Sequence, residues 1–356
     1  MEYEQRPLTD VLADFPPNAA IQEMVFKTLD HIEHEAMTGG KIMVSISGGS
    51  DSDIMLDLFE RIGYPEGLVV YVWFDTGLEY DATKRHLREL EAKYGIQIKR
   101  FRPKITIAQA VKRTGLPFLS KDVTEKLGRL QKKRFPFWDT SLTMDAALVE
   151  YPRTKLGITW WFNARGHKKS NIENHFGLRE YIQAYPPETL FSNDCCRYVK
   201  KNPAKVFTKT YGITLEVIGV RRAEGGVRAS AYQTCFSEAT DKKVAQFRPL
   251  FYLTDQDKQE YKDFCGVTYS DCYEVWGFKR TGCVCCPFGS TFEQELDIVK
   301  MYEPKLYAAA CKIFGPSYEY TRKYRTFKEA YKREKRRHGQ IDLFDNPDTI
   351  LNGGDM

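Results

Sequence analysis

Serines, glycines and an aspartate crowd one short stretch of the chain, SISGGSDS at residues 45–52. A β-favouring run precedes it, and a pattern with the apolar periodicity of a helix follows it. A glycine-rich turn between a strand and a helix leaves backbone N–H groups pointing outward at the positive end of the helix dipole, and serine hydroxyls add further donors. No lysine follows the second glycine, so this is not the Walker-type loop. The stretch predicts a phosphate or pyrophosphate site, with a turn that only caps the helix as the alternative.

Five of the nine cysteines gather in two short stretches far apart in the chain. They are Cys195 and Cys196 in NDCCR, and Cys283, Cys285 and Cys286 in TGCVCCPFG. Two pairs, one of them spaced C-x-x-C, predict a four-thiolate site, and thiolates select zinc or an iron–sulfur cluster. Adjacent cysteines suit a tetrahedral zinc site poorly, because two thiolates separated by one backbone step must point along two different coordination directions. Structural zinc and buried thiols without a metal remain alternatives, and the four scattered cysteines are predicted to lie in the core.

Two other polar stretches follow predicted strands. Asp75, Thr76 and Gly77 come at the end of one strand, and VIGVRRAEGGVRAS at residues 217–230 begins at the end of another. Ligands of open parallel sheets bind outside the carboxyl ends of the strands, and guanidinium groups match phosphate oxygens in pairs. These stretches therefore predict nucleotide contacts. A simple strand-end turn for Asp75 and surface ion pairs for the arginines are the alternatives.

Elements that position these residues can be read from the periodicity of the apolar residues. The pattern predicts a helix at 18–37, then strand 41–46, helix 52–62, strand 68–73, helix 80–94 and strand 96–101. This alternation predicts an α/β fold with a doubly wound parallel sheet and a helical C-terminal part. Further along, we expect broken helices at 107–150, a strand or loop at 155–165, a helix at 196–211 that Pro203 begins or kinks, and mostly helices from about 255.

The expected domains are an N-terminal helical segment at 1–37, a nucleotide-binding α/β domain at 38–250, and a helical part at 251–356 that carries cluster cysteines and a basic helix. That basic segment, 319–338, is predicted to be either a solvated amphipathic helix or a face that tracks phosphates. No apolar run reaches the length of a bilayer span and no signal peptide is evident, so we expect a cytoplasmic protein without a membrane partner. In that compartment clustered cysteines are metal ligands more often than disulfides.

Residues 45–52 resemble the PP-loop, SGGxDS, of ATP pyrophosphatases such as GMP synthetase and tRNA-thiolating enzymes. This resemblance implies an adenine nucleotide alpha hydrolase-like fold whose loop holds the β,γ-phosphates while the α-phosphate is transferred. The DTG stretch and the pattern Gly219, Arg221, Arg222, Glu224, Arg228 resemble the phosphoadenosine phosphosulfate (PAPS) and adenylyl-sulfate reductase family. The cysteine pattern resembles that of iron–sulfur adenylyl-sulfate reductases. It implies a [4Fe–4S] cluster on Cys195, Cys196, Cys283 and Cys286, with Cys285 as the alternative ligand.

Two features depart from the reductases. The last cysteine is Cys311, so the end of the sequence lacks the nucleophilic thiol of their tail, and the SGGSDS loop is intact where theirs is degenerate. The combination resembles the ATP-pyrophosphatase sulfurtransferases of DNA phosphorothioation systems. It implies that the chain binds ATP with Mg²⁺, adenylates an acceptor oxygen, releases pyrophosphate and supports sulfur transfer. The implied partners are a nucleic-acid acceptor and a sulfur donor such as a cysteine desulfurase.

The residues expected to be catalytic are Ser47, Asp51, Ser52 and Asp75. Those expected to bind the nucleotide are Ser45, Ser47, Gly48, Gly49, Ser50, Asp51, Ser52, Asp75, Thr76, Gly77, Gly219, Arg221, Arg222 and Arg228. Two alternative functions remain. One is a PAPS or adenylyl-sulfate reductase that uses an external thiol, and the other is a non-catalytic nucleotide-binding subunit of a defence complex.

Overall fold

A computed structural model describes residues 6–164, 170–225 and 231–337. The chain forms two compact units. The first consists of residues 1–110, 195–285 and 293–309, and the second of residues 111–194, 286–292 and 310–356. The three-part division expected from the sequence, with boundaries at 37 and 250, remains a prediction.

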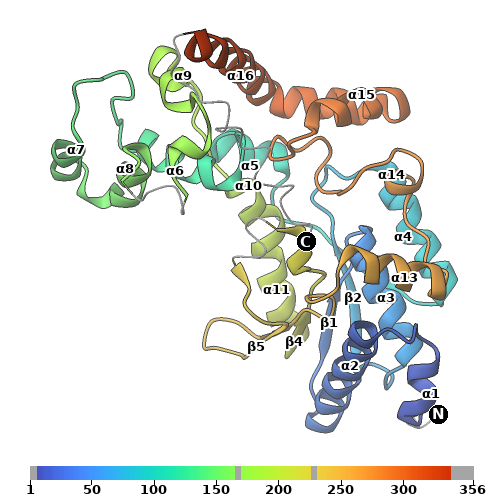
Figure 1. The fold of residues 1–356 in the computed structure, drawn as a ribbon. Coiled ribbons are helices and arrows are strands. Elements are labelled where there is room, and N and C mark those ends of the chain that lie inside the picture. The colour runs from blue at the N-terminus through green and yellow to red at the C-terminus, as the bar shows by residue number, and fades with distance from the viewer. Residues whose placement is uncertain (1–5, 165–169, 226–230, 338–356) are drawn as a thin grey trace. The chain divides into compact units, whose positions relative to one another are not determined.

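The first unit contains a six-stranded sheet in the order β3-β2-β1-β4-β6-β5, of which Figure 1 labels β1, β2, β4 and β5. Its strands are β1 Ile42–Ser45, β2 Val69–Phe74, β3 Ile98–Phe101, β4 Leu215–Val217, β5 Phe236–Ser237 and β6 Ala245–Phe247. All neighbouring pairs are parallel except β5 with β6. The chain runs outward from β1 to β3 and then resumes on the other side of β1 with β4. This order confirms the doubly wound α/β fold and puts its switch point between β1 and β4.

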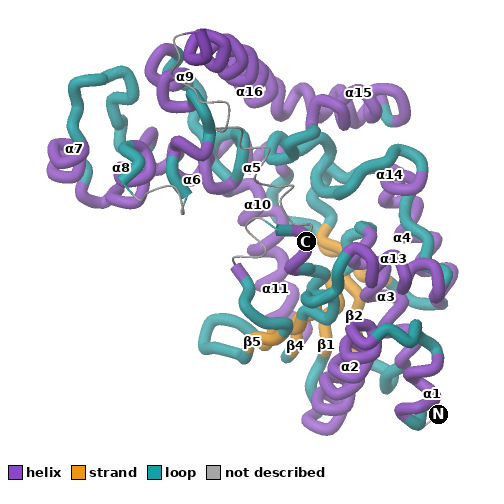
Figure 2. Tube along the Cα trace, viewed as in Figure 1, coloured by secondary structure: helices purple, strands orange, loops and turns teal. Residues whose placement is uncertain are grey.

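Helices cover both faces of this sheet. Successive residues of each strand point to opposite sides, so each face packs against its own set of helices. Ile42 and Val44 of β1 pack in one core with α2 Ala19–Thr38, α3 Ser50–Ile62, α4 Asp81–Tyr94 and α13 Asp255–Cys265. Met43 packs on the other face with Phe207 of α11, the helix Asn202–Tyr211. Figure 2 shows α2 and α3 on one side of the strands and α11 on the other.

Shorter helices complete the first unit. They are α1 Leu8–Ala13, α10 Asp194–Cys196, whose first residue belongs to the second unit, the π-helix η3 Arg197–Lys201, the 3-10 helix η4 Arg222–Glu224, α14 Asp271–Glu274 and nearly all of α15 Phe292–Tyr302. Pro203 stands in the first turn of α11, where its missing N–H costs nothing. The helix expected at 196–211 is present as α10, η3 and α11 in direct succession, and Pro203 stands where the π-helical turn gives way to α-helix and does not begin the helix.

The second unit is helical in its described part. It holds α6 Lys121–Gln131, α7 Met144–Glu150, α8 Lys155–Trp161, α9 Leu178–Ala184, the short η1 Pro152–Thr154 and η2 Ile172–Asn174, part of α5 Ile107–Thr114 and most of α16 Pro304–Arg337. The strand or loop expected at 155–165 is wrong for residues 155–161, which form α8. Ile158 and Trp160 are fully buried there, and Gly157 lies against Leu130 of α6. Packing thus overrides the β-propensity of isoleucine, threonine and tryptophan.

Aromatic side chains on α16 pack within the second unit. The ring of Tyr181 on α9 lies 5.1 Å from that of Tyr320, 5.5 Å from that of Tyr324 and 5.4 Å from that of Phe327, between ring centroids. The basic segment is therefore an amphipathic helix whose aromatic side is used for packing. Within the described ranges, no helix combines the length and the apolar character needed to cross a membrane.

Candidate functional site

The SGGSDS loop connects β1 to α3 at the switch point of the sheet. Gly48 adopts φ +65°, a left-handed conformation that favours glycine. A Cβ added to Gly48 would lie 2.6 Å from Cγ2 of Thr83 on α4, so the loop is pressed against that helix. Both the conformation and the close approach explain why this position is glycine.

Ser52 closes the loop on its own helix. Its Oγ accepts hydrogen bonds from the backbone N–H of Ser47 at 3.2 Å and from that of Gly49 at 3.1 Å. Its hydroxyl donates to the carbonyl of Gly49 at 2.7 Å. Ser52 and Ser50 are buried, whereas Ser47 is exposed and Ser45 is half-buried at the end of β1. The loop is therefore pre-shaped by its own serine.

Asp51 is the meeting point of the loop with two distant basic residues. Arg221 Nε donates to Asp51 Oδ1 at 3.1 Å, and Lys258 Nζ donates to the same oxygen at 2.6 Å. A Cβ added to Gly219 would lie 3.3 Å from the Cβ of Asp51, so the arginine stretch runs directly beside the loop. Burial pushes the pKa of Asp51 up, but the charges of Lys258 and Arg221 outweigh it and the pKa is lowered.

Asp75 lies at the end of β2 in a turn stabilised by ion pairs. Its Oδ1 accepts the backbone N–H of Gly77 at 2.9 Å, and its Oδ2 accepts Arg100 Nε at 2.8 Å and Arg102 Nε at 3.4 Å. Burial raises its pKa, but the amide and the two arginines together lower it below the ordinary value. This geometry accounts for Asp75 as a strand-end turn residue. A nucleotide role for it stays a prediction.

Thr76 links the DTG stretch to the cysteine-rich turn. Its hydroxyl donates to Glu79 Oε1 at 2.6 Å and lies 3.8 Å from Cys283 Sγ. The turn runs along this stretch, since the N–H of Val284 donates to the carbonyl of Leu78 at 3.0 Å. Two sequence stretches about two hundred residues apart are thus brought together within the first unit.

Cys285 stands in a left-handed conformation inside that turn, with φ 47°, and is fully buried. Its N–H donates to the hydroxyl of Tyr80 at 3.1 Å, which anchors the turn between Cys283 and Cys286. Left-handed backbone at a residue other than glycine costs free energy and concentrates at functional sites.

The thiol of Cys283 is sensitive to the charged groups around it. Burial raises the pKa of the Cys283 thiol to about 11, Lys200 opposes this, and Glu79 and Cys196 add to it. Cys195 is buried on α10, directly before the π-helical turn, and π-helical turns recur at functional sites. Cys286 belongs to the second unit.

All nine cysteines lie in the described part of the chain, and none of them forms a disulfide there. The same described residues contain no group of three or more His, Cys, Asp or Glu side chains arranged to hold a metal ion. The donor set suits a thiolate-bound centre, but the ligand set stays a sequence prediction.

Other predicted residues are placed less centrally. Arg222 is exposed at the start of η4, and its N–H donates to the carbonyl of Phe251 at 2.9 Å, while Glu224 ends that short helix. Arg228 lies outside the described residues.

Two features of the site were not anticipated from the sequence. One is Lys258, which comes from the first turns of α13. The other is a buried pair beneath the loop, in which His86 Nε2 lies 2.9 Å from Asp53 Oδ2. Asp53 follows the loop directly, but its partner is 33 residues away on α4, so no local pattern marks the pair. Both side chains are buried, and burial raises the pKa of Asp53 even against the attraction of His86.

The His86–Asp53 pair makes a prediction about stability. Burial lowers the pKa of His86, but the hydrogen bond and charge of Asp53, with Glu89, raise it above its ordinary value of 6.5. A raised histidine pKa stabilises the folded state below pH 6.5, and this contribution is lost as the pH rises through the folded value. We therefore expect the urea concentration at the midpoint of unfolding to fall as the pH rises from 6.5 through the folded pKa of His86. The fall should disappear in His86→Gln and persist in His34→Gln, since His34 is exposed. A midpoint that stays level or rises over this range would contradict the assignment.

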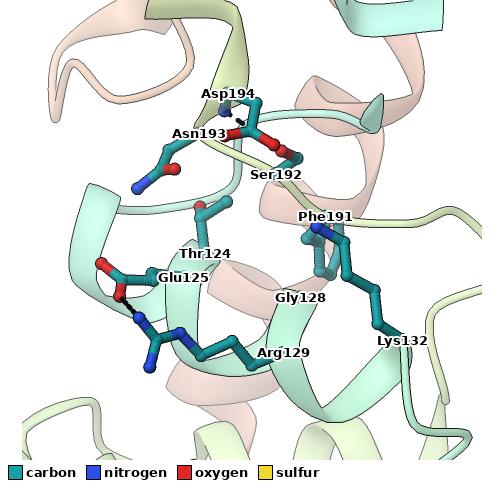
Figure 3. A pocket seen from close by; sticks show the side chains of 9 residues that line it. All are labelled: Thr124, Glu125, Gly128, Arg129, Lys132, Phe191, Ser192, Asn193 and Asp194. Carbon is teal, nitrogen blue, oxygen red and sulfur yellow. Dashed lines mark hydrogen bonds and ion pairs between the residues drawn. The ribbon is translucent and has the colours of Figure 1, made fainter. Parts of the chain in front are cut away.

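A separate pocket of about 230 Å³ lies in the second unit (Figure 3). It is lined by Thr124, Glu125, Gly128, Arg129, Lys132, Phe191, Ser192, Asn193 and Asp194. Arg129 pairs with Glu125 at 2.5 Å across its edge, and acidic and basic side chains balance in its lining. This mixture of charges favours no particular ligand chemistry.

One family model matches residues of both units. A model described as the phosphoadenosine phosphosulfate reductase domain matches residues 41–135 and 137–288, which is more than half of the chain. The matched range includes the SGGSDS loop, the arginine stretch and all five clustered cysteines. No curated protein matches the chain.

Solved structures resemble the chain at low identity. The PAPS reductase of Candida auris, in a phosphate complex, is 12% identical with a TM-score of 0.40, and the likeness covers 80% of this chain and 97% of that one. The U34-tRNA thiolase NcsA of Methanococcus maripaludis, with its [4Fe–4S] cluster, is 14% identical with a TM-score of 0.35, covering 82% and 72%. The FMN adenylyltransferase of Candida glabrata is 9% identical with a TM-score of 0.39, covering 78% and 70%.

Proposed function

Because the chain belongs to the phosphoadenosine phosphosulfate reductase domain family, we propose that it is a PP-loop enzyme that uses ATP to adenylate an acceptor oxygen. The observation that carries this proposal is the intact SGGSDS loop at the switch point, with Arg221 and Lys258 both held on Asp51. Anions bind at helix N-termini that follow such loops, and basic side chains there neutralise their charge.

The proposed reaction is a displacement at the α-phosphorus of ATP. The acceptor oxygen forms a bond to this phosphorus, the bond to the oxygen that bridges to the β-phosphate breaks, and pyrophosphate leaves with that electron pair. The loop and Arg221 hold the β,γ-phosphates and stabilise the charge that builds on the leaving group. In this role the amide and hydroxyl donors of Ser47, Gly49 and Ser52, which bond to one another in the structure, turn to the phosphates.

We propose that Mg²⁺ takes none of its ligands from the protein. The two aspartates that the sequence offers are each paired with basic side chains, Asp51 with Lys258 and Arg221, and Asp75 with Arg100 and Arg102. Carboxylates neutralised in this way are poor attractors for a further cation. The ion would therefore arrive on the phosphate oxygens of the nucleotide.

Cys195, Cys196, Cys283 and Cys286 are the proposed ligands of a [4Fe–4S] cluster, as the sequence resemblance implies. When bound, the cluster would supply sulfide that displaces AMP from the adenylated acceptor, and AMP leaves with the activated oxygen. Support from the structure is limited to Cys283, whose sulfur lies 3.8 Å from Thr76 Oγ1 beside the DTG stretch. A cysteine desulfurase is the proposed sulfur donor, and its persulfide sulfur reaches the sulfide level with two electrons from a thiol reductant.

A nucleic acid is the acceptor class that the second unit favours. The aromatic side of α16 is packed, and its exposed residues include Arg322, Lys323, Arg333 and Arg336. Exposed basic side chains attract a phosphate backbone, although Lys323 pairs with Glu319 and Glu329 and Glu334 are exposed on the same helix. This supports, as part of the proposal, an acceptor oxygen carried by DNA or RNA.

ATP/[³²P]pyrophosphate exchange tests the proposal. We expect label to enter ATP when the purified full chain is supplied with ATP, Mg²⁺ and DNA or RNA, because adenylation is reversible while pyrophosphate is present. Exchange should stop in Arg221→Met, since that change removes a charge from the loop. Absence of exchange with every acceptor, nucleic acids included, would count against the proposal.

A second candidate is favoured by the family description itself, which names PAPS reductases. In that case the chain would release sulfite from PAPS or adenylyl sulfate with electrons from an external thiol protein. Sulfite production with added thioredoxin, in a preparation without pyrophosphate exchange, would decide for this candidate.

A further inference from the structure

The first turn of α3 carries negative charge where a phosphate site needs positive charge. Asp51 and Asp53 stand in this turn, and residues 45–52 contain no lysine or arginine. Carboxylates at a helix N-terminus suit the helix dipole but repel an incoming triphosphate. The site proposed above therefore requires basic groups that come from elsewhere in the chain.

Two basic residues account for part of this requirement. His86 lies under Asp53, away from the loop surface, and offsets that carboxylate. Arg221 contacts Asp51 through Nε, but its Nη1 also pairs with Asp255 at 2.8 Å, so its charge is shared.

Lys258 makes the shortest contacts to the loop. Its Nζ lies 2.6 Å from Asp51 Oδ1 and 2.6 Å from Ser50 Oγ, and its side chain is only 14% exposed. An ammonium group carries three N–H donors, so these contacts use two of the three. Ser50 and Asp51 are the fourth and fifth residues of the SGGSDS motif, so the ammonium lies directly against the loop.

The backbone around Lys258 is held firmly. Thr254 caps α13 by accepting the N–H of Asp257 at 3.1 Å, and Asp257 returns a contact to the N–H of Thr254 at 2.8 Å. Asn18, at the start of α2, donates to Asp257 at 2.9 Å and to Glu260 at 2.8 Å. The lysine is thus presented by a capped helix that is bonded to a neighbouring helix, which keeps its position preorganised.

We propose that Lys258 is the phosphate-binding lysine of this protein and that it contacts the β,γ-phosphates of a nucleoside triphosphate. The inference rests on the proposed function and adds to it the charge that the loop lacks. On binding, the ammonium exchanges part of its contact with Asp51 for a phosphate oxygen. The ligand class that it selects is one with a pyrophosphate group, in preference to a nucleoside monophosphate.

Inorganic pyrophosphate is the direct probe, measured by calorimetric titration of the full chain alongside ATP and AMP. We expect Lys258→Met to weaken pyrophosphate and ATP binding by about tenfold to a hundredfold, since a charge-assisted hydrogen bond is lost. AMP binding should not change, and Lys258→Arg should retain most of the affinity. Lys262→Met is the matched control, because Lys262 is on the same helix and over the same Tyr269 ring but pairs with Glu274.

The outcomes separate the inference from the proposed function. Wild-type protein that binds neither ATP nor pyrophosphate overturns both. Wild-type binding that is unchanged in Lys258→Met overturns the lysine assignment alone. Equal losses for AMP and pyrophosphate would show a merely structural lysine and also overturn it. If Lys258→Met has a lower melting temperature than the Lys262→Met control, Lys258→Gln is measured in its place. The same loss of pyrophosphate and ATP binding is expected, and the outcomes are interpreted in the same way.

Discussion

Replacing Cys283 by serine should remove the iron–sulfur chromophore from protein purified without oxygen. Cys283 is a proposed cluster ligand that contacts the DTG stretch, because its sulfur lies 3.8 Å from Thr76 Oγ1. A serine hydroxyl is a harder and weaker ligand than a thiolate, so the replacement should release iron instead of holding it less tightly. Absorption and EPR spectra, with iron, sulfide and zinc analysis, measure the result.

Cys235→Ser is the matched control for this experiment. Cys235 is also half-buried in the first unit but is one of the scattered cysteines, so its variant should keep the full iron content. Cys285→Ser tests the alternative ligand. We expect it to keep the cluster, because Cys285 is fully buried, with its backbone held by Tyr80. Wild-type protein that contains stoichiometric zinc and no iron, or a Cys283 variant with undiminished iron, would refute the cluster assignment.

Gly48→Ala should reduce ATP binding and pyrophosphate exchange by roughly a hundredfold or more. The left-handed φ of +65° costs an alanine roughly 1–2 kcal/mol, and a Cβ 2.6 Å from Thr83 Cγ2 adds an overpacking cost of about 1–3 kcal/mol. Both effects destabilise the loop conformation that nucleotide binding requires. Equilibrium binding of ATP and the initial rate of exchange are the measurements.

Two further variants separate the backbone cost from the steric one. Gly95→Ala has nearly the same backbone angle, φ +66°, but a Cβ there meets nothing within 4 Å, so activity should be unaffected. Thr83→Ser in the Gly48→Ala background removes the obstructing methyl and should restore part of the binding. Full activity in Gly48→Ala would mean that the loop is not the nucleotide site.

Much of the site's scaffold is predictable from sequence because its determinants are local. The β-favouring runs and helical patterns of the first hundred residues correctly predict three strands and the helices between them, each within a few residues of its bounds. The SGGSDS stretch is correctly placed between a strand and a helix, and the left-handed Gly48 explains its glycine. Residues 155–161 are the exception, since burial of Trp160 decides for a helix against local propensity.

The sequence by itself determined the alternation of strands and helices, the place of the glycine loop and the residue types able to bind a phosphate and a metal. Such features depend on contacts within about one or two turns of chain, where spacing reports geometry directly. Only the tertiary structure decided which groups meet: Lys258 with Asp51, His86 with Asp53, and Thr76 with Cys283, pairs that are 207, 33 and 207 residues apart. It also decided that Asp75 is paired with Arg100. The crossing order of the strands brings these side chains together, and no spacing along the chain records that order.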